Sequence, residues 1–176
     1  MRVCVVVLLP ISAALLAACA SSVKAPDVPA SLMPPAGQAP FLETLANGVQ
    51  IYECVAKQGQ PGVYEWTFRA PEATLTDWSG RALGKHYAGP VWEAADGSRV
   101  LGEVAARDPG PDPKAIPWLL LVAKSTSGGG VFTPTTSIQR VATAGGVTPI
   151  EPCGASNVNQ FWRVPYTATY YFYKQR

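Results

Sequence analysis

Residues 63–70, VYEWTFRA, alternate large apolar and polar side chains one by one. A period of two places the Tyr, Trp, Phe and Ala on one face of an extended strand and the Glu, Thr and Arg on the other. No stretch of the sequence shows convincing amphipathic helical spacing. The chain is therefore restricted to a structure made of partly buried β-strands.

Further strands are expected along the chain. Residues 116–124, IPWLLLVAK, are apolar without alternation, and their length and neighbouring prolines favour a fully buried strand. Residues 136–143 and 164–174 are rich in β-branched and aromatic side chains, and proline and glycine lie between the runs. We expect an all-β fold: a single-domain β-sandwich or β-barrel of about eight mostly antiparallel strands over residues 41–176.

Two dipeptides predict hairpin turns. Asn47-Gly48 and Asp96-Gly97 each lie between two β-compatible runs. Both pairs accept the positive φ angles of a type I′ turn. A hairpin is therefore expected at each position.

The N-terminal residues predict export. The apolar run of about 14 residues that follows Arg2 is too short for a membrane-spanning helix and is typical of a signal peptide. The LAAC stretch that ends at Cys19 resembles the bacterial lipoprotein box, in which the cysteine carries a lipid. Residues 1–18 are then the signal, and Cys19 anchors the protein to the membrane. An ordinary signal peptide, cut after Ala18 or Ala20, is the alternative.

The residues after Cys19 favour a particular destination. Ala20 is not the aspartate that usually retains lipoproteins in the inner membrane, so the outer membrane, facing the periplasm, is expected in a Gram-negative host. Residues 19–40 are rich in Pro, Ala and Ser and predict an extended tether. With 14 basic and 12 acidic residues, the chain carries no excess charge that would favour nucleic acid as a partner.

Cysteine usage agrees with export. Cys4 lies in the signal and Cys19 is assigned to the lipid, which leaves Cys54 and Cys153. In an oxidising compartment these two are expected to form a disulfide. A redox or metal role is the alternative, but the two cysteines lack the C-x-x-C spacing of such sites.

Several stretches resemble, in order, the DUF3455 family of exported bacterial and fungal proteins. They are NGVQIYEC, GKHYAGPVWEAADGSRV, IPWLLLVAKSTSGGGVF, TSIQRVATAGGVTPIEPC and VPYTATYYFY. The resemblance covers residues 40–174 and implies no activity, because the family has no known function. It directs attention to residues 84–92.

His86, the single histidine of the chain, lies in that stretch. Its ordinary pKa suits an acid or base catalyst at neutral pH. The candidate carboxylate partners are Asp77, Glu93 and Asp96, and Ser79 is a candidate nucleophile. The alternative is a structural histidine bonded to backbone carbonyls, which the lack of a nucleophile motif favours. One histidine and scattered carboxylates predict no metal site, and no cofactor is expected.

Aromatic side chains beside turns suggest a binding face. Trp78 and Trp92 lie next to turn residues and are expected to be exposed, and with His86 and Tyr87 they form the candidate binding set. Our first hypothesis is a non-enzymatic envelope module that binds a glycan, a small apolar ligand or another envelope protein. The alternative is a small envelope hydrolase that uses His86.

Overall fold

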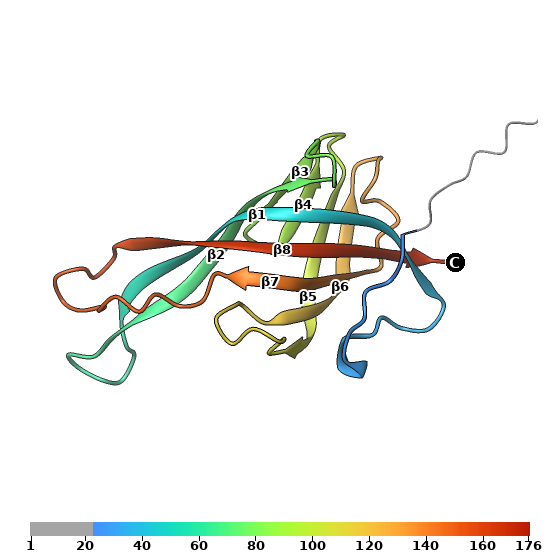
Figure 1. The fold of residues 1–176 in the computed structure, drawn as a ribbon. Helices are drawn as coiled ribbons and strands as arrows, with labels where there is room; N and C mark the ends of the chain where they lie inside the picture. The colour runs from blue at the N-terminus through green and yellow to red at the C-terminus, as the bar shows by residue number, and fades with distance from the viewer. Residues whose placement is uncertain (1–22) are drawn as a thin grey trace, which may run out of the picture.

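The computed structural model describes residues 23–176, which form one closed barrel of eight antiparallel strands (Figure 1). Each strand pairs with the next along the chain, and β8 pairs with β1 to close the sheet. The expectation of an all-β domain is confirmed, and of the two architectures the barrel is the one formed. The strands are β1 Gln38–Ala56, β2 Tyr64–Thr76, β3 Ala82–Tyr87, β4 Val91–Ala94, β5 Arg99–Asp108, β6 Trp118–Ser127, β7 Ser137–Gly145 and β8 Phe161–Gln175.

The closing pair, β1 and β8, contains the two longest strands, with 19 and 15 residues. Together with the first part of β2, which pairs with the end of β1, both extend beyond the other strands, at the left in Figure 1. Closure pairs both edges of β8, with β1 and with β7, so neither edge is free to bind a further strand. Tyr170 and Phe172 face the core, while Tyr171 and Tyr173 alternate onto the outer face.

The hairpin predicted at Asn47-Gly48 is wrong, because β1 runs without a turn from Gln38 to Ala56. Gly48 has a packing role instead: a Cβ at this position would overlap the backbone carbonyl oxygen of Glu72 on β2. The glycine therefore permits close approach of two strands rather than a turn.

The hairpin predicted at Asp96-Gly97 is confirmed. Strands β4 and β5 pair in antiparallel register on either side of it, and Gly97 has a φ of 84°. Asp96 also accepts a hydrogen bond from the backbone N–H of Val131 at 2.8 Å, which holds the β6–β7 loop over this end of the barrel. The next residue, Phe132, is fully buried against Phe172, with ring centroids 4.6 Å apart. Its side chain closes this end of the barrel.

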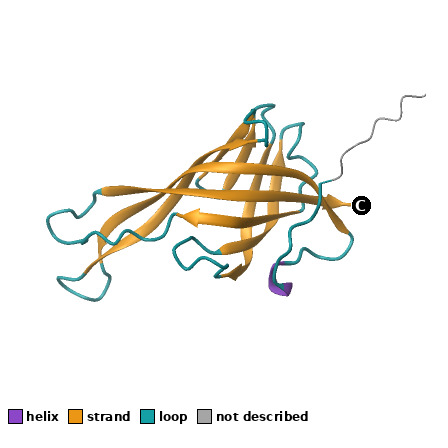
Figure 2. Ribbon diagram, viewed as in Figure 1, coloured by secondary structure: helices purple, strands orange, loops and turns teal. Residues whose placement is uncertain are grey.

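The segment before β1 packs on the outside of the barrel. It contains one short 3₁₀ helix, η1 Ala30–Leu32, which lies beside the strands in Figure 2. Leu32 is fully buried, and its carbonyl oxygen accepts a hydrogen bond from Gln139 Nε2 at 2.7 Å. Gln139 alternates with the core residue Ile138, so it faces outward from β7. A tether was expected over residues 19–40. In the structure, η1 is packed on the barrel and residues 38–40 belong to β1, so this part of the segment is attached to the domain.

The same attachment explains the continuous apolar run in β6. Leu119 and Leu121 belong to the barrel core. Leu120 points the other way but is still buried, on the side where η1 contacts β5 and β6. Both faces of the strand are therefore covered at residues 119–121. From Val122 onward one face is exposed, so the full burial expected over residues 116–124 holds only for the first part of the strand.

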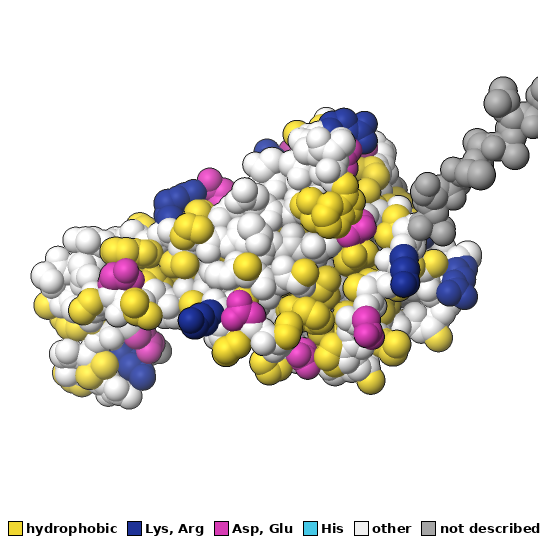
Figure 3. Space-filling view, viewed as in Figure 1, with side chains coloured by type: hydrophobic (Ala, Val, Ile, Leu, Met, Phe, Trp, Pro, Cys, Tyr) yellow, Lys and Arg dark blue, Asp and Glu magenta, His cyan; other side chains and the backbone are white. Residues whose placement is uncertain are grey.

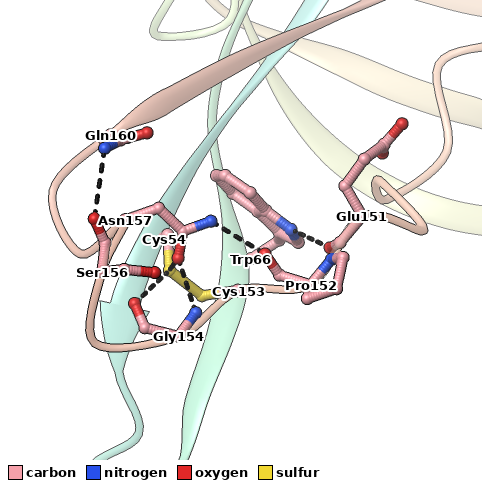
Figure 4. The surroundings of a disulfide bond; sticks show 9 residues. All are labelled: Cys54, Trp66, Glu151, Pro152, Cys153, Gly154, Ser156, Asn157 and Gln160. Carbon is pink, nitrogen blue, oxygen red and sulfur yellow. Dashed lines mark hydrogen bonds between the residues drawn. A yellow bond between two sulfur atoms is a disulfide. The ribbon is translucent and has the colours of Figure 1, made fainter.

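The disulfide between Cys54 and Cys153 is confirmed, with an S–S distance of 2.03 Å (Figure 4). It joins β1 to the loop between β7 and β8. Asn157 organises that loop by accepting a hydrogen bond from the Gly154 N–H and donating one to the Pro152 carbonyl. Trp66 of β2 donates to the Glu151 carbonyl at 2.8 Å, which ties the loop to a second strand.

The predicted signal peptide and the predicted lipid attachment at Cys19 lie outside the described residues. Within residues 23–176, no helix has the length and hydropathy required to span a bilayer.

Candidate functional site

Two of the four predicted binding residues meet inside the barrel. His86 on β3 and Trp92 on β4 are cross-strand partners, and their rings are stacked with centroids 4.3 Å apart. Tyr170 of β8 meets both rings edge-on, at 5.2 Å from His86 and 5.3 Å from Trp92. An aromatic cluster from three strands thus lies in the barrel interior.

The other two residues lie elsewhere. Trp78, in the β2–β3 turn, is 72% exposed, as expected for a residue beside a turn. Tyr87 donates a hydrogen bond to Glu93 at 2.7 Å, and Glu93 alternates away from Trp92 onto the outer surface. The expected exposure of Trp92 is wrong: only 1% of the residue is accessible. The short β3–β4 hairpin turns this side chain inward, and the structure does not bring the four residues together on one face.

His86 itself is buried, and no histidine is visible on the face shown in Figure 3. Its Nδ1 lies 2.9 Å from the carbonyl oxygen of Val91, so the neutral ring donates to the backbone. Burial lowers the pKa of His86 to about 3; the Val91 carbonyl opposes this shift and the positive charge of Arg140 adds to it. The imidazole is therefore uncharged at neutral pH.

The carboxylates considered as partners of His86 lie away from its ring. Asp77 accepts hydrogen bonds from the hydroxyl of Ser79 and the backbone N–H of Arg81 in an exposed turn, and the pKa of Asp77 falls to about 2, chiefly through the Ser79 bond. Asp96 holds the β4–β5 turn and the β6–β7 loop. Glu93 binds Tyr87, Lys85 and Arg99 on the outer surface. These groups organise turns and surface pairs, and none is hydrogen-bonded to His86.

A cavity of about 540 Å³ opens beside the aromatic cluster. His86, Trp92 and Tyr170 line it, together with Tyr52 and Phe68 from the first two strands. Other strand residues complete its wall, and the β3–β4 turn, the β5–β6 loop and the β7–β8 loop contribute residues at its rim. These connections lie at the opposite end of the barrel from the end that the Phe132 side chain closes. The interior is therefore a cup, closed at one end and accessible at the other.

Some polar groups inside the cup lack an ordinary hydrogen bond. Three side chains that line the cavity, Gln50, Trp92 and Tyr170, are each at most 2% exposed. Gln50 Nε2, Trp92 Nε1 and the Tyr170 hydroxyl make no hydrogen bond of ordinary geometry among the described residues. Tyr170 still has the side chains of Tyr166 and Arg140 as polar neighbours, and Gln50 has that of Tyr166. A buried polar group without a partner costs free energy, so such groups need an explanation. All three can donate a hydrogen bond.

Charged side chains also line the cavity, and among the described ones Arg140 is the one that is partly buried. It lies on β7 opposite Tyr170 and lines the cavity. Its Nε and Nη2 donate to the Pro117 carbonyl at 3.1 and 2.7 Å, and it forms no ion pair within the described part of the chain. Sequence reasoning missed Gln50, Tyr170 and Arg140. A signal was available for Arg140, because it alternates in phase with the core residue Ile138.

Residues 23–176 contain no group of three or more His, Cys, Asp or Glu side chains placed to hold a metal ion. The donors inside the barrel are N–H and O–H groups, which suit hydrogen bonding to a ligand.

The fold and the cavity together define a small up-and-down β-barrel with a pocket, an architecture whose interior is either filled by side chains or large enough for one small ligand. Residues 35–174 match the family model described as "Protein of unknown function (DUF3455)", and the chain belongs to this family. The resemblance noted in the sequence is thereby confirmed. No curated protein and no solved structure matches the chain.

Proposed function

We propose that this protein binds a small, mainly apolar molecule inside its barrel. The observation that carries the proposal is the cavity of about 540 Å³, which lies in the size range of small-ligand pockets and has aromatic walls with a few polar groups. Glycans and protein partners, the other candidates from the sequence, are less well matched to a recessed cup than to an open surface.

The geometry favours binding over hydrolysis. His86 uses Nδ1 on the Val91 carbonyl, and its lowered pKa keeps it uncharged at neutral pH. No serine, cysteine, aspartate or glutamate is among the described residues that line the cavity. An acid or base needs a reacting group within hydrogen-bond reach, and this side chain instead forms part of an aromatic wall.

The protein is also proposed to act in the cell envelope, anchored by a lipid on Cys19 and facing the periplasm from the outer membrane. The short apolar N-terminal run with LAAC supports this location. The Cys54–Cys153 disulfide agrees with an oxidising compartment.

Binding is tested with the neutral dye N-phenyl-1-naphthylamine, whose fluorescence rises when it leaves water. Saturable binding by the purified full chain is expected. Val104→Trp fills the cavity and should weaken dye binding at least tenfold, because Val104 lines the pocket. Val122→Trp is the matched control, since Val122 is the register partner of Glu103 and is 36% exposed.

Thermal unfolding and circular dichroism establish that both variants are folded. Equal dye binding by the wild type and both variants would place the dye outside the cavity and overturn the proposal. Absence of saturable dye binding by the folded wild type would also count against it.

Anchoring is tested separately by labelling cells with a palmitate analogue. Incorporation that is lost in Cys19→Ala, together with globomycin-sensitive processing, is expected. Unchanged membrane attachment of the Cys19→Ala protein would remove the lipid anchor from the proposal.

A further inference from the structure

The charges around the cavity all have one sign. Three arginines line it, Arg69, Arg107 and Arg140, and no acidic side chain does so. Arg69 is neutralised by Glu53, with Nε and Oε2 2.6 Å apart. Arg107 and Arg140 form no ion pair among residues 23–176. The cavity therefore carries positive charge without an internal counter-ion.

Arg140 is the deeper of the two unpaired cations. It is partly buried, whereas Arg107 is exposed. A guanidinium has five N–H groups, and Arg140 directs two of its nitrogen atoms at the Pro117 carbonyl, which leaves N–H groups available. The neighbours of this cation are a carbonyl and the hydroxyl of Tyr170, and no carboxylate pairs with it among residues 23–176, so its charge is incompletely compensated. An anion beside it would complete the pairing.

The buried polar groups of the cavity wall that make no hydrogen bond can all donate one, as binding of an anion requires. Gln50 Nε2 and Trp92 Nε1 are donors, and the Tyr170 hydroxyl can donate. Tyr170 is the cross-strand neighbour of Arg140, and its raised pKa, due mainly to burial, keeps it protonated. Several donors and one partly buried cation around a single cavity form an arrangement suited to an oxygen anion.

We propose that the ligand is a small organic carboxylate, with its apolar body against the aromatic wall and its carboxylate on Arg140. This inference rests on the proposed binding function and adds the chemical class of the ligand. The planar guanidinium can bind a carboxylate with two parallel hydrogen bonds. The body can be an aromatic ring or an alkyl chain of lipid origin, and the two kinds share the same head group.

The experiment compares acids with their neutral amides by calorimetry on the purified full chain. Cinnamate and cinnamamide test an aromatic body, and octanoate and octanamide test an alkyl body. At least one acid is expected to bind ten times more tightly than its amide, and the pair that shows the difference identifies the body.

Arg140→Gln tests the assigned contact. This variant removes the charge but can still donate to Pro117, and it should abolish the preference for acid over amide. Arg163→Gln is the matched control, because Arg163 pairs with Glu72 on the exposed surface and is absent from the cavity wall. It should keep the full preference. Dye binding by Arg140→Gln reports that its cavity is intact, and Arg140→Met, which also removes the charge, replaces it if Arg140→Gln does not fold.

The possible results distinguish failure of the carboxylate inference from failure of the proposed ligand binding. Equal affinity for acid and amide, or an acid preference that survives in folded Arg140→Gln, overturns the carboxylate inference. Dye binding without binding of either acid also overturns the carboxylate inference, and the proposed binding of apolar molecules would then stand alone. Failure of the dye itself to bind removes the proposed function and, with it, this inference.

Discussion

The ring of His86 lies flat against the indole of Trp92, with 4.3 Å between their centroids and 15° between their planes. The two residues are register partners on β3 and β4, and both side chains point into the barrel. The stacked pair occupies the cavity wall, where the ring of His86 contributes an apolar face and its Nδ1 is committed to Val91. This arrangement buries the titratable imidazole of His86, so the free energy of unfolding should depend on pH.

We predict that acid destabilises the protein through His86. The unfolded chain binds a proton at this residue near pH 6.5, whereas burial lowers the pKa in the folded protein to about 3. The unfolded state therefore binds more protons between these values, and the free energy of unfolding falls as the pH drops through this window. The contribution of one such group is about 1.4 kcal/mol per pH unit.

Urea unfolding at several pH values measures this effect as the difference between wild type and His86→Phe. The carboxylates titrate in both proteins, so their effect cancels to first order. The variant should lose less stability on acidification. Parallel stability curves for the two proteins between pH 6.5 and pH 4 would contradict the prediction.

The segment before β1 should contribute to stability through Leu32. Its side chain is fully buried on the outer face of the barrel, so Leu32→Ala should lower the free energy of unfolding by about 2–5 kcal/mol. Met33, the next residue, is 63% exposed, and Met33→Ala is expected to change stability by less than about 0.5 kcal/mol. Urea unfolding of the two variants makes the comparison, and equal effects would show that the segment is not held by Leu32.

Gly48 should not tolerate a side chain. A Cβ there would overlap the Glu72 carbonyl and lie 2.5 Å from Ala73 Cα, both part of the β2 backbone, so Gly48→Ala should destabilise the barrel by on the order of 3 kcal/mol. Gly129→Ala is the control, since nothing lies within 4 Å of its Cβ position. Thermal unfolding gives both values. A Gly48→Ala protein as stable as the control would mean that β1 and β2 are further apart than described.

Removal of the Cys54–Cys153 disulfide should lower the stability of the protein. The bond spans 99 residues of sequence, and Cys54→Ser/Cys153→Ser should lower the free energy of unfolding by roughly 2–5 kcal/mol. A reducing agent should produce the same loss in the wild type and no further loss in the double variant. If reduction destabilised the double variant equally, the effect would come from a source other than this bond.

The sequence predicted the strands better than their connections. Alternation in residues 63–70 and the continuous apolar run in residues 116–124 identified β2 and β6, because burial on one or two faces leaves a local pattern. Asn47-Gly48 misled because a glycine that permits a turn also permits two strands to approach closely. The two uses have the same local signature, and the opposing backbone at Glu72 distinguishes them.

The candidate site was predicted in part. His86 was selected as the single histidine and Trp92 for its position near a turn, and both line the cavity, but Trp92 was expected on the surface. Gln50, Arg140 and Tyr170 come from β1, β7 and β8 and reach the same cavity only after the barrel closes. No local pattern relates residues so distant in the chain.

By itself, the sequence determined the β class of the domain and the pairing of Cys54 with Cys153, because alternation and cysteine number are local or countable properties. The choice of a barrel over a sandwich, the inward direction of Trp92 and the convergence of Arg140 with Tyr170 were decided by tertiary structure. The physical reason is the β1–β8 pairing, which joins the two ends of the domain. Closure gives every strand an inside and an outside, and only then do polar residues spaced along the chain share one cavity.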